Sequence, residues 1–333
     1  MARTYRILSI DGGGIRGLIP ALVLAEFERQ TGRAIADCFD LIAGTSTGGI
    51  LALGLTRPGA DGRPAFPAEA LADLYRKEGG RIFAESPWRR ITNPLGLRAA
   101  KYPSEGIEGV LQTFFGESRL KEALTEVFVT AYDIEQRDAF FYRRRKARGD
   151  ARYDVPMRVA ARATSAAPTY FEPALVAWPE GRDVLVDGGV FANNPAMCAY
   201  AEARQTLERE GREADDILLV SLGTGLYTKP FRYEEAKGWG VAGWARPVLD
   251  VIFDGVADTV DYQLRQLLAP GPGNVPRYHR FQADLNADLS EMDDTSPGHL
   301  QGLQQAAAGI LERQAAEVEA LAKRLAAMSS GQI

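Results

Sequence analysis

The sequence has few of the residues that build metal sites, disulfide frameworks and histidine-based catalytic centres. Its 333 residues include only two cysteines, Cys38 and Cys198, and only two histidines, His279 and His299. Two isolated cysteines form no disulfide framework and lack metal-ligand spacing. No cluster of His or carboxylate residues has ligand spacing either. We therefore predict that the protein uses no metal and no other cofactor.

Long apolar runs and an excess of positive charge are missing as well. No run of about eighteen apolar residues is present, so we expect no transmembrane helix. The net charge of −5 argues against binding to a nucleic-acid polymer. The first residues, "MARTYRILSIDGGG", pass from a very short apolar run directly into glycines, which is not the pattern of a signal peptide. These features predict a cytoplasmic protein whose contact with the inner membrane is at most peripheral.

Hydrophobic and charged contents of 46% and 25% are those of a globular protein. The first 55 residues alternate between two patterns: a strand at 6–10, a glycine loop, a helix from Leu18, a strand at 39–43, a tight turn and a helix over 48–55. Two such alternations predict a parallel sheet covered by helices. The predicted fold class is α/β, a three-layer α/β/α arrangement with a mostly parallel central sheet.

The rest of the chain continues this alternation. Strands are predicted at about 126–132, 139–143, 183–189 and 217–225, and helices at 194–211, 247–268 and over the last thirty residues. No internal repeat and no break in composition marks a linker. We therefore predict a single catalytic domain, 1–333, with a core at about 5–225 and a helical flank or cap at 228–333.

The stretch "GTSTGG" begins at Gly44, directly after the second predicted strand and before a helix. A nucleophile on such a turn needs unusual backbone angles, which the small residues Gly44 and Gly48 around Ser46 permit. The helix that opens after Ser46 directs free N–H groups toward developing negative charge. The pattern indicates a nucleophilic Ser46, although a glycine-rich turn packed under a helix has the same residues.

A second glycine loop, "DGGGIRG", follows the first strand. Consecutive backbone N–H groups of Gly12, Gly13 and Gly14 can form an anion-binding nest, with Arg16 beside it. The nest suits either an oxyanion or a nucleotide phosphate. The dinucleotide pattern G-x-G-x-x-G is matched, but no acidic residue ends the second strand, because Asp40 lies inside it. A P-loop is excluded, since no G-K-[ST] follows.

The third site is "VDGGVFANNP", where Asp187 ends a strand and Gly188 and Gly189 follow. An Asp-Gly turn is common. Together with the first two sites, however, a carboxylate at a strand end becomes a candidate base. The neighbouring Asn193 and Asn194 are expected to brace this loop, and "LGTG" at 222–225 to form a strand-end turn near the same face.

These motifs, with "SAAPTYF" at 165–171, occur in the order and spacing of patatin-like phospholipases, which the chain resembles from about residue 5 to residue 225. The resemblance implies a lipid acyl hydrolase with Ser46 as nucleophile, Asp187 as base and Gly12, Gly13 and Gly14 as oxyanion hole. It implies a phospholipid or other acyl-ester lipid as substrate. Within the family, the chain also resembles the cyclic-nucleotide-activated phospholipases of bacterial anti-phage defence, which implies a cyclic-nucleotide effector.

Two other interpretations stay open. A serine usually transfers its proton to histidine, so a Ser46–His–Asp187 triad of α/β-hydrolase type, with His279 or His299, is one alternative. A non-catalytic module that binds a nucleotide phosphate on the glycine loop is the other.

Two segments outside the motifs also bear on partners. The basic stretch "FFYRRRKARG" at 140–149 can contact anionic groups or lie as a solvated hairpin edge. The segment 239–268, with Trp239 and Trp244 before an amphipathic helix, reads equally well as a lid or interfacial element and as core packing.

Overall fold

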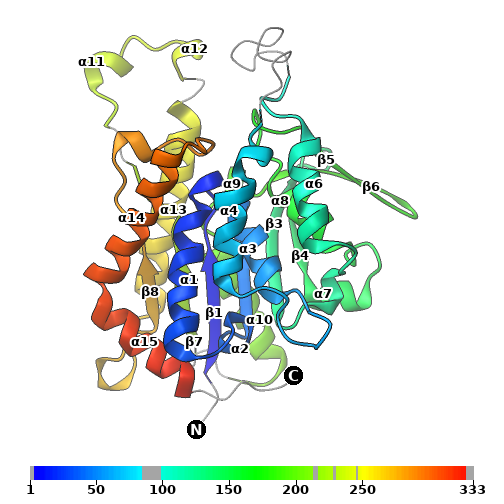
Figure 1. Cartoon of the computed structure of the whole chain (residues 1–333), viewed down its shortest axis with the longest axis vertical. Helices are drawn as coiled ribbons and strands as arrows, with labels where there is room; N and C mark the ends of the chain where they lie inside the picture. Colours follow the sequence, from blue (N-terminus) through cyan, green and yellow to red (C-terminus); the bar gives the residue numbers. More distant parts are fainter. Residues whose placement is uncertain (1–3, 85–98, 213–216, 228–229, 245–246, 328–333) are drawn as a thin grey trace.

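In the computed structural model, residues 4–84, 99–212, 217–227, 230–244 and 247–327 are described. One eight-stranded sheet lies between two layers of helices (Figure 1). The predicted three-layer α/β/α fold is therefore confirmed. The sequence "FAESPWRRITNPLGLRAAKYP" at 83–103 predicts an irregular segment, and most of it, residues 85–98, lies outside the described residues.

The strands are β1 (Tyr5–Ile10), β2 (Leu41–Gly44), β3 (Glu126–Asp133), β4 (Asp138–Arg143), β5 (Ala174–Trp178), β6 (Gly181–Asp187), β7 (Ile217–Leu222) and β8 (Tyr278–Phe281). Their order is β5–β6–β3–β2–β1–β7–β8, and β4 pairs with β3. The run β3–β2–β1–β7–β8 is parallel, whereas β4, β5 and β6 join antiparallel. The sheet is thus mixed but mostly parallel. Its parallel strands β1, β2 and β7 are buried throughout, as expected for strands covered on both faces.

The helices are α1 (Leu18–Thr31), α2 (Ile35–Cys38), α3 (Thr47–Thr56), α4 (Ala68–Ile82), α6 (Ser104–Phe115), α7 (Arg144–Gly149), α8 (Met157–Thr164), α9 (Gly189–Ala192), α10 (Ala196–Arg209), α11 (Tyr233–Ala236), α12 (Val241–Trp244), α13 (Pro247–Leu267), α14 (Pro297–Arg313) and α15 (Ala315–Ala327). Side chains of β1 point alternately to the two faces of the sheet, and each face has its own hydrophobic core. Leu8 and Ile10 pack with α1, α3, α4 and α14, while Tyr5 and Ile7 pack with α10 and α13.

The last part of the chain adds to the same sheet. β8 pairs with β7, and α14 and α15 pack against α1. One long C-terminal helix was expected, and that expectation was wrong. The chain leaves helical geometry at Gln314 (φ −110°, ψ 24°), and this bend lets the buried sides of both α14 and α15 reach the core.

The edge of β3 brings two chain segments together. β4 occupies one edge of β3 along Phe128–Asp133, so β2 and β6 must share the other. On that edge β2 runs parallel and ends opposite Val129, whereas β6 runs antiparallel and ends opposite Ala131. The carboxyl ends of β2 and β6 therefore meet from opposite directions, and the residues that follow them are neighbours.

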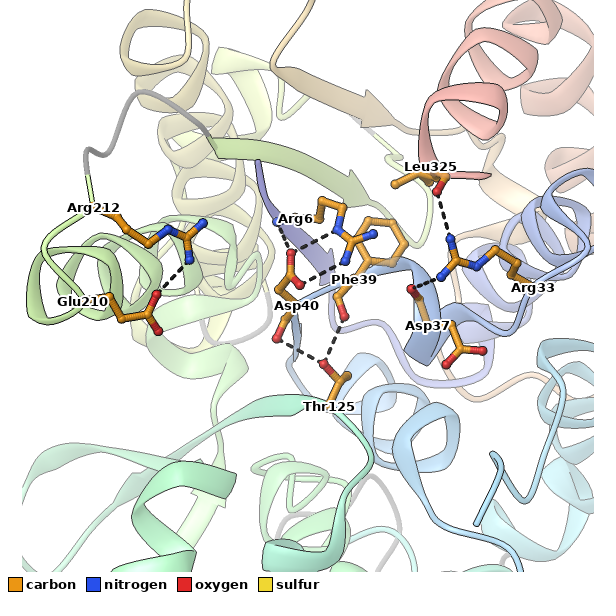
Figure 2. A network of polar contacts seen from close by, with 9 residues as sticks. All are labelled: Arg6, Arg33, Asp37, Phe39, Asp40, Thr125, Glu210, Arg212 and Leu325. Atoms are coloured by element: carbon orange, nitrogen blue, oxygen red, sulfur yellow. Dashed lines mark hydrogen bonds and ion pairs between the residues drawn. The ribbon is translucent and has the colours of Figure 1, made fainter. Parts of the chain in front are cut away.

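The opposite end of the sheet is closed by a buried ion pair (Figure 2). The guanidinium of Arg6 binds both oxygens of Asp40 at 3.0 Å, and the Arg6 N–H donates to the same carboxylate at 2.8 Å. The side chains are only 2% and 4% exposed. Thr125 Oγ1 donates to the carbonyls of Phe39 and Asp40, which adds the start of β3 to this network. Asp40 is thus a structural residue at the start of β2.

Replacing Asp40 by Asn is expected to lower the free energy of unfolding by about 3–5 kcal/mol, because it leaves the Arg6 guanidinium buried without its counter-ion. Urea denaturation measures the change. The control is Arg182→Ala, which breaks the exposed pair Arg182–Glu135 and should cost less than about 1 kcal/mol. Equal losses in both variants would contradict the importance of the buried pair.

Candidate active site

Ser46 lies in the turn between β2 and α3, where it has φ 55° and ψ −122°. A positive φ is unfavourable for any residue other than glycine and persists only where the surroundings enforce it. Here the Ser46 N–H donates to Thr164 Oγ1 of α8 at 2.8 Å, which holds the turn. The side chain is half-buried, so a substrate can reach it. This is the geometry of a nucleophile at a strand-to-helix turn.

The two motif glycines are required by close backbone contacts. A Cβ on Gly44 would lie 2.1 Å from the Gly48 carbonyl oxygen, and one on Gly48 would lie 2.1 Å from the carbonyl oxygen of Ile10. Both distances are far below a van der Waals contact. The start of α3 therefore packs directly on the end of β1, and this brings Ser46 next to the loop that follows β1.

Asp187 is the last residue of β6, and its Oδ1 accepts a hydrogen bond from the Gly189 N–H at 2.7 Å. The Ser46 hydroxyl lies near the same carboxyl group and favours its ionised form. The carboxyl group is 5% exposed. Burial raises the pKa of Asp187 from 3.8 to about 7, and the Ser46 hydroxyl and the Gly189 N–H only partly oppose this rise. The predicted nucleophile and base are thus brought together at one site.

Gly188 and two threonines hold the Asp187 loop against β2 and β3. A Cβ on Gly188 would lie 2.1 Å from Thr130 Oγ1. Thr45 Oγ1 is 2.7 Å from that same atom and donates to the Ala192 carbonyl at 2.6 Å. The residue before the serine is therefore bonded to the helix that follows the aspartate.

The glycine loop after β1 lies directly beside Ser46. A Cβ on Gly12 would be 3.3 Å from the Cβ of Ser46 and 2.4 Å from Asn193 Oδ1. The Gly12 N–H donates to the Asn193 carbonyl at 3.0 Å. The N–H groups of Gly13 and Gly14, by contrast, form no hydrogen bond with any described residue. Of the three loop glycines, Gly13 and Gly14 therefore have backbone N–H groups available to bind an oxyanion.

Arg16 and Asp11 anchor the two ends of this loop. The buried Arg16 donates to the Ser290 carbonyl at 3.4 Å, in the segment before α14. Asp11 forms a buried ion pair of 2.6 Å with Arg280 of β8, which also donates to Ser221 Oγ of β7 at 2.8 Å. Arg16 therefore ties the loop to the last part of the chain, and Asp11 ties it to two neighbouring strands.

Both histidines have partners elsewhere. His279 Nδ1 is 2.7 Å from a carboxylate oxygen of Glu317 in α15. His299 Nδ1 is 3.1 Å from the Asp288 carbonyl oxygen and 3.5 Å from the Asp294 carboxylate. Within the described part of the chain, no hydrogen bond joins either imidazole to Ser46 or Asp187. The geometry gives a histidine-containing triad no support.

The sequence motifs located the serine, the aspartate and the glycine loop, but not all of the residues that hold them. Thr164, which accepts from Ser46, and Thr224, which donates to the Gly12 carbonyl at 2.7 Å, are side chains whose type gives no signal of a site. Asn193 was expected to brace the Asp187 loop. Its carbonyl accepts from the Gly12 N–H, which joins the Asp187 loop to the glycine loop.

Residues 8–200, which include all three motifs, match the sequence pattern of patatin-like phospholipases. The chain belongs to this family. It is 32% identical over 347 residues to "Patatin-like protein 2" of Arabidopsis thaliana. That alignment covers 94% of this chain and 84% of the plant protein. The chain is 30% identical over 334 residues to "Probable inactive patatin-3-Kuras 1" of Solanum tuberosum, covering 93% and 87%.

The patatin-like family expected from the motifs is therefore confirmed, and both of these relatives are plant proteins. They give no support to the anti-phage branch. The crystal structure of VipD from Legionella pneumophila covers 94% of this chain and 67% of that chain, with a TM-score of 0.39 and 12% identity. That likeness is too distant to support an argument.

Two features are absent from the described residues. No group of three or more His, Cys, Asp and Glu side chains in the described ranges is arranged to hold a metal ion. Among the helices of the same ranges, none is long and apolar enough to span a bilayer.

Replacing Asp187 by Asn is expected to stabilise the protein at about pH 8 but not at about pH 4. Because the pKa of Asp187 is raised by folding, the folded state binds this proton more tightly than the unfolded state, and stability falls as pH rises from about 4 to above 7. An amide removes that loss, which amounts to about 4 kcal/mol at about pH 8. Urea denaturation at the two pH values measures it.

The matched control for this experiment is Asp284→Asn, at an exposed carboxylate. Its effect on the free energy of unfolding should be small and equal at both pH values. A gain for Asp187→Asn that does not change with pH would contradict the raised pKa.

Proposed function

We propose that the protein is a serine lipid acyl hydrolase of phospholipase A or lysophospholipase type, with Ser46 as nucleophile and Asp187 as general base. The observation that carries this proposal is the placement of the Ser46 hydroxyl near the buried Asp187 carboxyl group, where the carboxyl ends of β2 and β6 meet. The half-buried serine, the strained turn and the N–H groups of Gly13 and Gly14, which no described residue accepts, support the same function.

In this mechanism the Ser46 oxygen attacks the acyl carbonyl carbon while Asp187 takes the hydroxyl proton. The N–H groups of Gly13 and Gly14 stabilise the negative oxygen of the tetrahedral intermediate. Asp187 then gives its proton to the leaving alcohol, and an acyl-enzyme remains. Water, deprotonated by Asp187, attacks the acyl group, and Ser46 recovers its proton as the fatty acid leaves.

The environment of Asp187 removes the main chemical objection to a dyad. A carboxylate with a pKa near 3.9 is a weak base toward an alcohol. Burial raises the pKa of Asp187 to about 7, close to neutral pH, where a general base combines ionisation with useful basicity. A histidine is not needed to supply a base of this strength.

The alternatives receive less support. Family membership alone does not establish catalysis, since one relative is named as probably inactive. A nucleotide-binding module lacks its ribose-binding acid, because Asp40 is bound to Arg6 at the opposite end of the sheet. In the basic stretch 140–149, which can contact anionic groups such as the phosphate of an effector, Arg143 and Arg145 are instead paired with Glu202. We therefore leave an effector out of the proposal.

We also propose that the protein is cytoplasmic and contacts the inner membrane peripherally. Figure 1 shows α11 and α12 at the end of the molecule toward which β1 runs. Exposed apolar side chains collect on α11, α12 and the start of α13, namely Tyr233, Val241, Trp244, Val248, Val251 and Ile252. From the same part of α13, Phe253 lies near Gly189, since a Cβ there would be 3.8 Å from its ring. This apolar surface therefore adjoins the site.

Ser46→Ala and Asp187→Asn are each expected to lower fatty-acid release from phospholipids and lysophospholipids by at least about 10³-fold, because each removes half of the activating pair. The folded double variant His279→Ala, His299→Ala should keep most of the activity. A panel of lipids with different head groups and sn-positions provides the assay. In parallel, a serine-reactive fluorophosphonate should label the native chain but not Ser46→Ala.

Each alternative has its own outcome in these experiments. Inactivity of the folded double-histidine variant favours the triad. Absence of any Ser46-dependent labelling, together with absence of hydrolysis, favours the non-catalytic module.

The double variant Trp239→Ala, Trp244→Ala is expected to bind phosphatidylcholine vesicles roughly tenfold more weakly than the native chain, which corresponds to about 1.4 kcal/mol. The two rings form a T-shaped pair with centroids 5.1 Å apart, next to the exposed apolar side chains. Vesicle flotation measures binding, and Leu175→Ala, at a side chain 64% exposed on β5, is the control. Unchanged binding in the double variant would leave these tryptophans only a packing role.

A further inference from the structure

The geometry points to Thr224 as a positioning residue that aims the N–H of Gly13 at the oxyanion, an inference that rests on the proposed function. Thr224 lies in the turn "LGTG" after β7, and its side chain is only 3% exposed. Its hydroxyl donates to the carbonyl oxygen of Gly12 at 2.7 Å. It reaches the glycine loop from a segment about 210 residues further along the chain.

The effect of this hydrogen bond follows from the geometry of the peptide group. The Gly12 carbonyl and the Gly13 N–H belong to one planar trans peptide, so they point in opposite directions. Since the carbonyl oxygen points to Thr224, the N–H points away from it. The hydroxyl of Thr224 therefore fixes the direction of a donor that it does not touch.

The glycine loop needs such a restraint. Glycine has access to most backbone angles, so a peptide between Gly12 and Gly13 can rotate and reverse its N–H at little steric cost. The next peptide is restrained in a comparable way, because the Gly13 carbonyl accepts from the Arg16 N–H at 3.2 Å. The N–H of Gly12 is held by the Asn193 carbonyl at 3.0 Å. Among these restraints only that of Thr224 comes from a side chain.

Thr224 itself is held firmly enough to act as a support. The Gly223 N–H donates to the Phe281 carbonyl at 2.9 Å, and the Gly225 N–H donates to Gln282 Oε1 at 2.7 Å. The turn thus rests on the end of β8. In addition, a Cβ on Gly13 would lie 2.3 Å from Thr224 Oγ1, so the contact itself requires glycine at position 13.

Thr224→Val tests this role, because valine has nearly the shape of threonine but no hydroxyl. We expect kcat for lysophospholipid hydrolysis to fall about 10- to 100-fold, less than the loss of a whole oxyanion donor, with KM unchanged within about twofold. Thr224→Ser, which keeps the hydroxyl, should restore kcat to within about threefold of the native value. The rate of fluorophosphonate labelling at Ser46 should fall in parallel with kcat, because its phosphoryl oxygen uses the same donors.

Thr56→Val is the matched control. Thr56 is equally buried, and its hydroxyl also donates to a backbone carbonyl, that of Ala52 at 2.8 Å, but at the far end of α3. This variant should lose thermal stability and keep its kcat. If Thr224→Val does not accumulate in folded form, Thr224→Ala is measured by the same criteria, since it adds no volume.

Three results overturn the inference. The first is an unchanged kcat in folded Thr224→Val, and the second is a Thr224→Ser variant as slow as Thr224→Val. The third is an equal fall of kcat in Thr56→Val. If the native chain shows neither hydrolysis nor Ser46-dependent labelling, the proposed function fails and this inference fails with it. If the native chain is active and Thr224→Val is equally active, only this inference fails and the proposed function stands.

Discussion

The site depends on one constraint, the sharing of a single edge of β3 by β2 and β6. The parallel strand ends opposite Val129 and the antiparallel strand ends opposite Ala131, so the turns that follow them are adjacent. Ser46 and Asp187 each occupy one of these turns. An entirely parallel sheet would place two such residues on neighbouring strands, at least one strand spacing apart. The antiparallel addition of β6 brings the carboxylate within reach of the hydroxyl.

Small residues and threonine hydroxyls then set the detail. Gly44, Gly48 and Gly188 let backbones approach where a Cβ would overlap a neighbouring atom. Hydroxyl groups next to these contacts satisfy the backbone, as Thr164 does for the Ser46 N–H. The consequence is a site with little freedom before any substrate arrives, which is the condition for stabilising charge in a transition state without reorganisation. Burial of the carboxylate belongs to the same arrangement, because the packing that excludes water also makes Asp187 a stronger base.

Much of this could be predicted from the sequence where local pattern and chemistry agree. The strand–loop–helix order of the first 55 residues predicted the sheet, and glycines around a serine and after an aspartate marked the turns. The antiparallel direction of β6 left no such mark, because strand direction is decided by pairing across the sheet. Strand β5 and helix α6 were missed, and so was the hydrogen bond from Thr224 to the glycine loop. A threonine that acts on a carbonyl some 210 residues earlier has no local pattern.

The attachment of the glycine loop to late parts of the chain has a consequence for biosynthesis. The loop is formed by residues 12–14, yet it is bonded to Asn193, to Thr224 and, through Ile15, to the carbonyl of Met292. A nascent polypeptide that has left the ribosome only as far as α8 has the serine, but neither the carboxylate nor the loop's anchors. By the proposed mechanism, such a chain cannot hydrolyse an acyl ester. Translation itself therefore delays the assembly of the proposed catalytic site until nearly the whole protein exists.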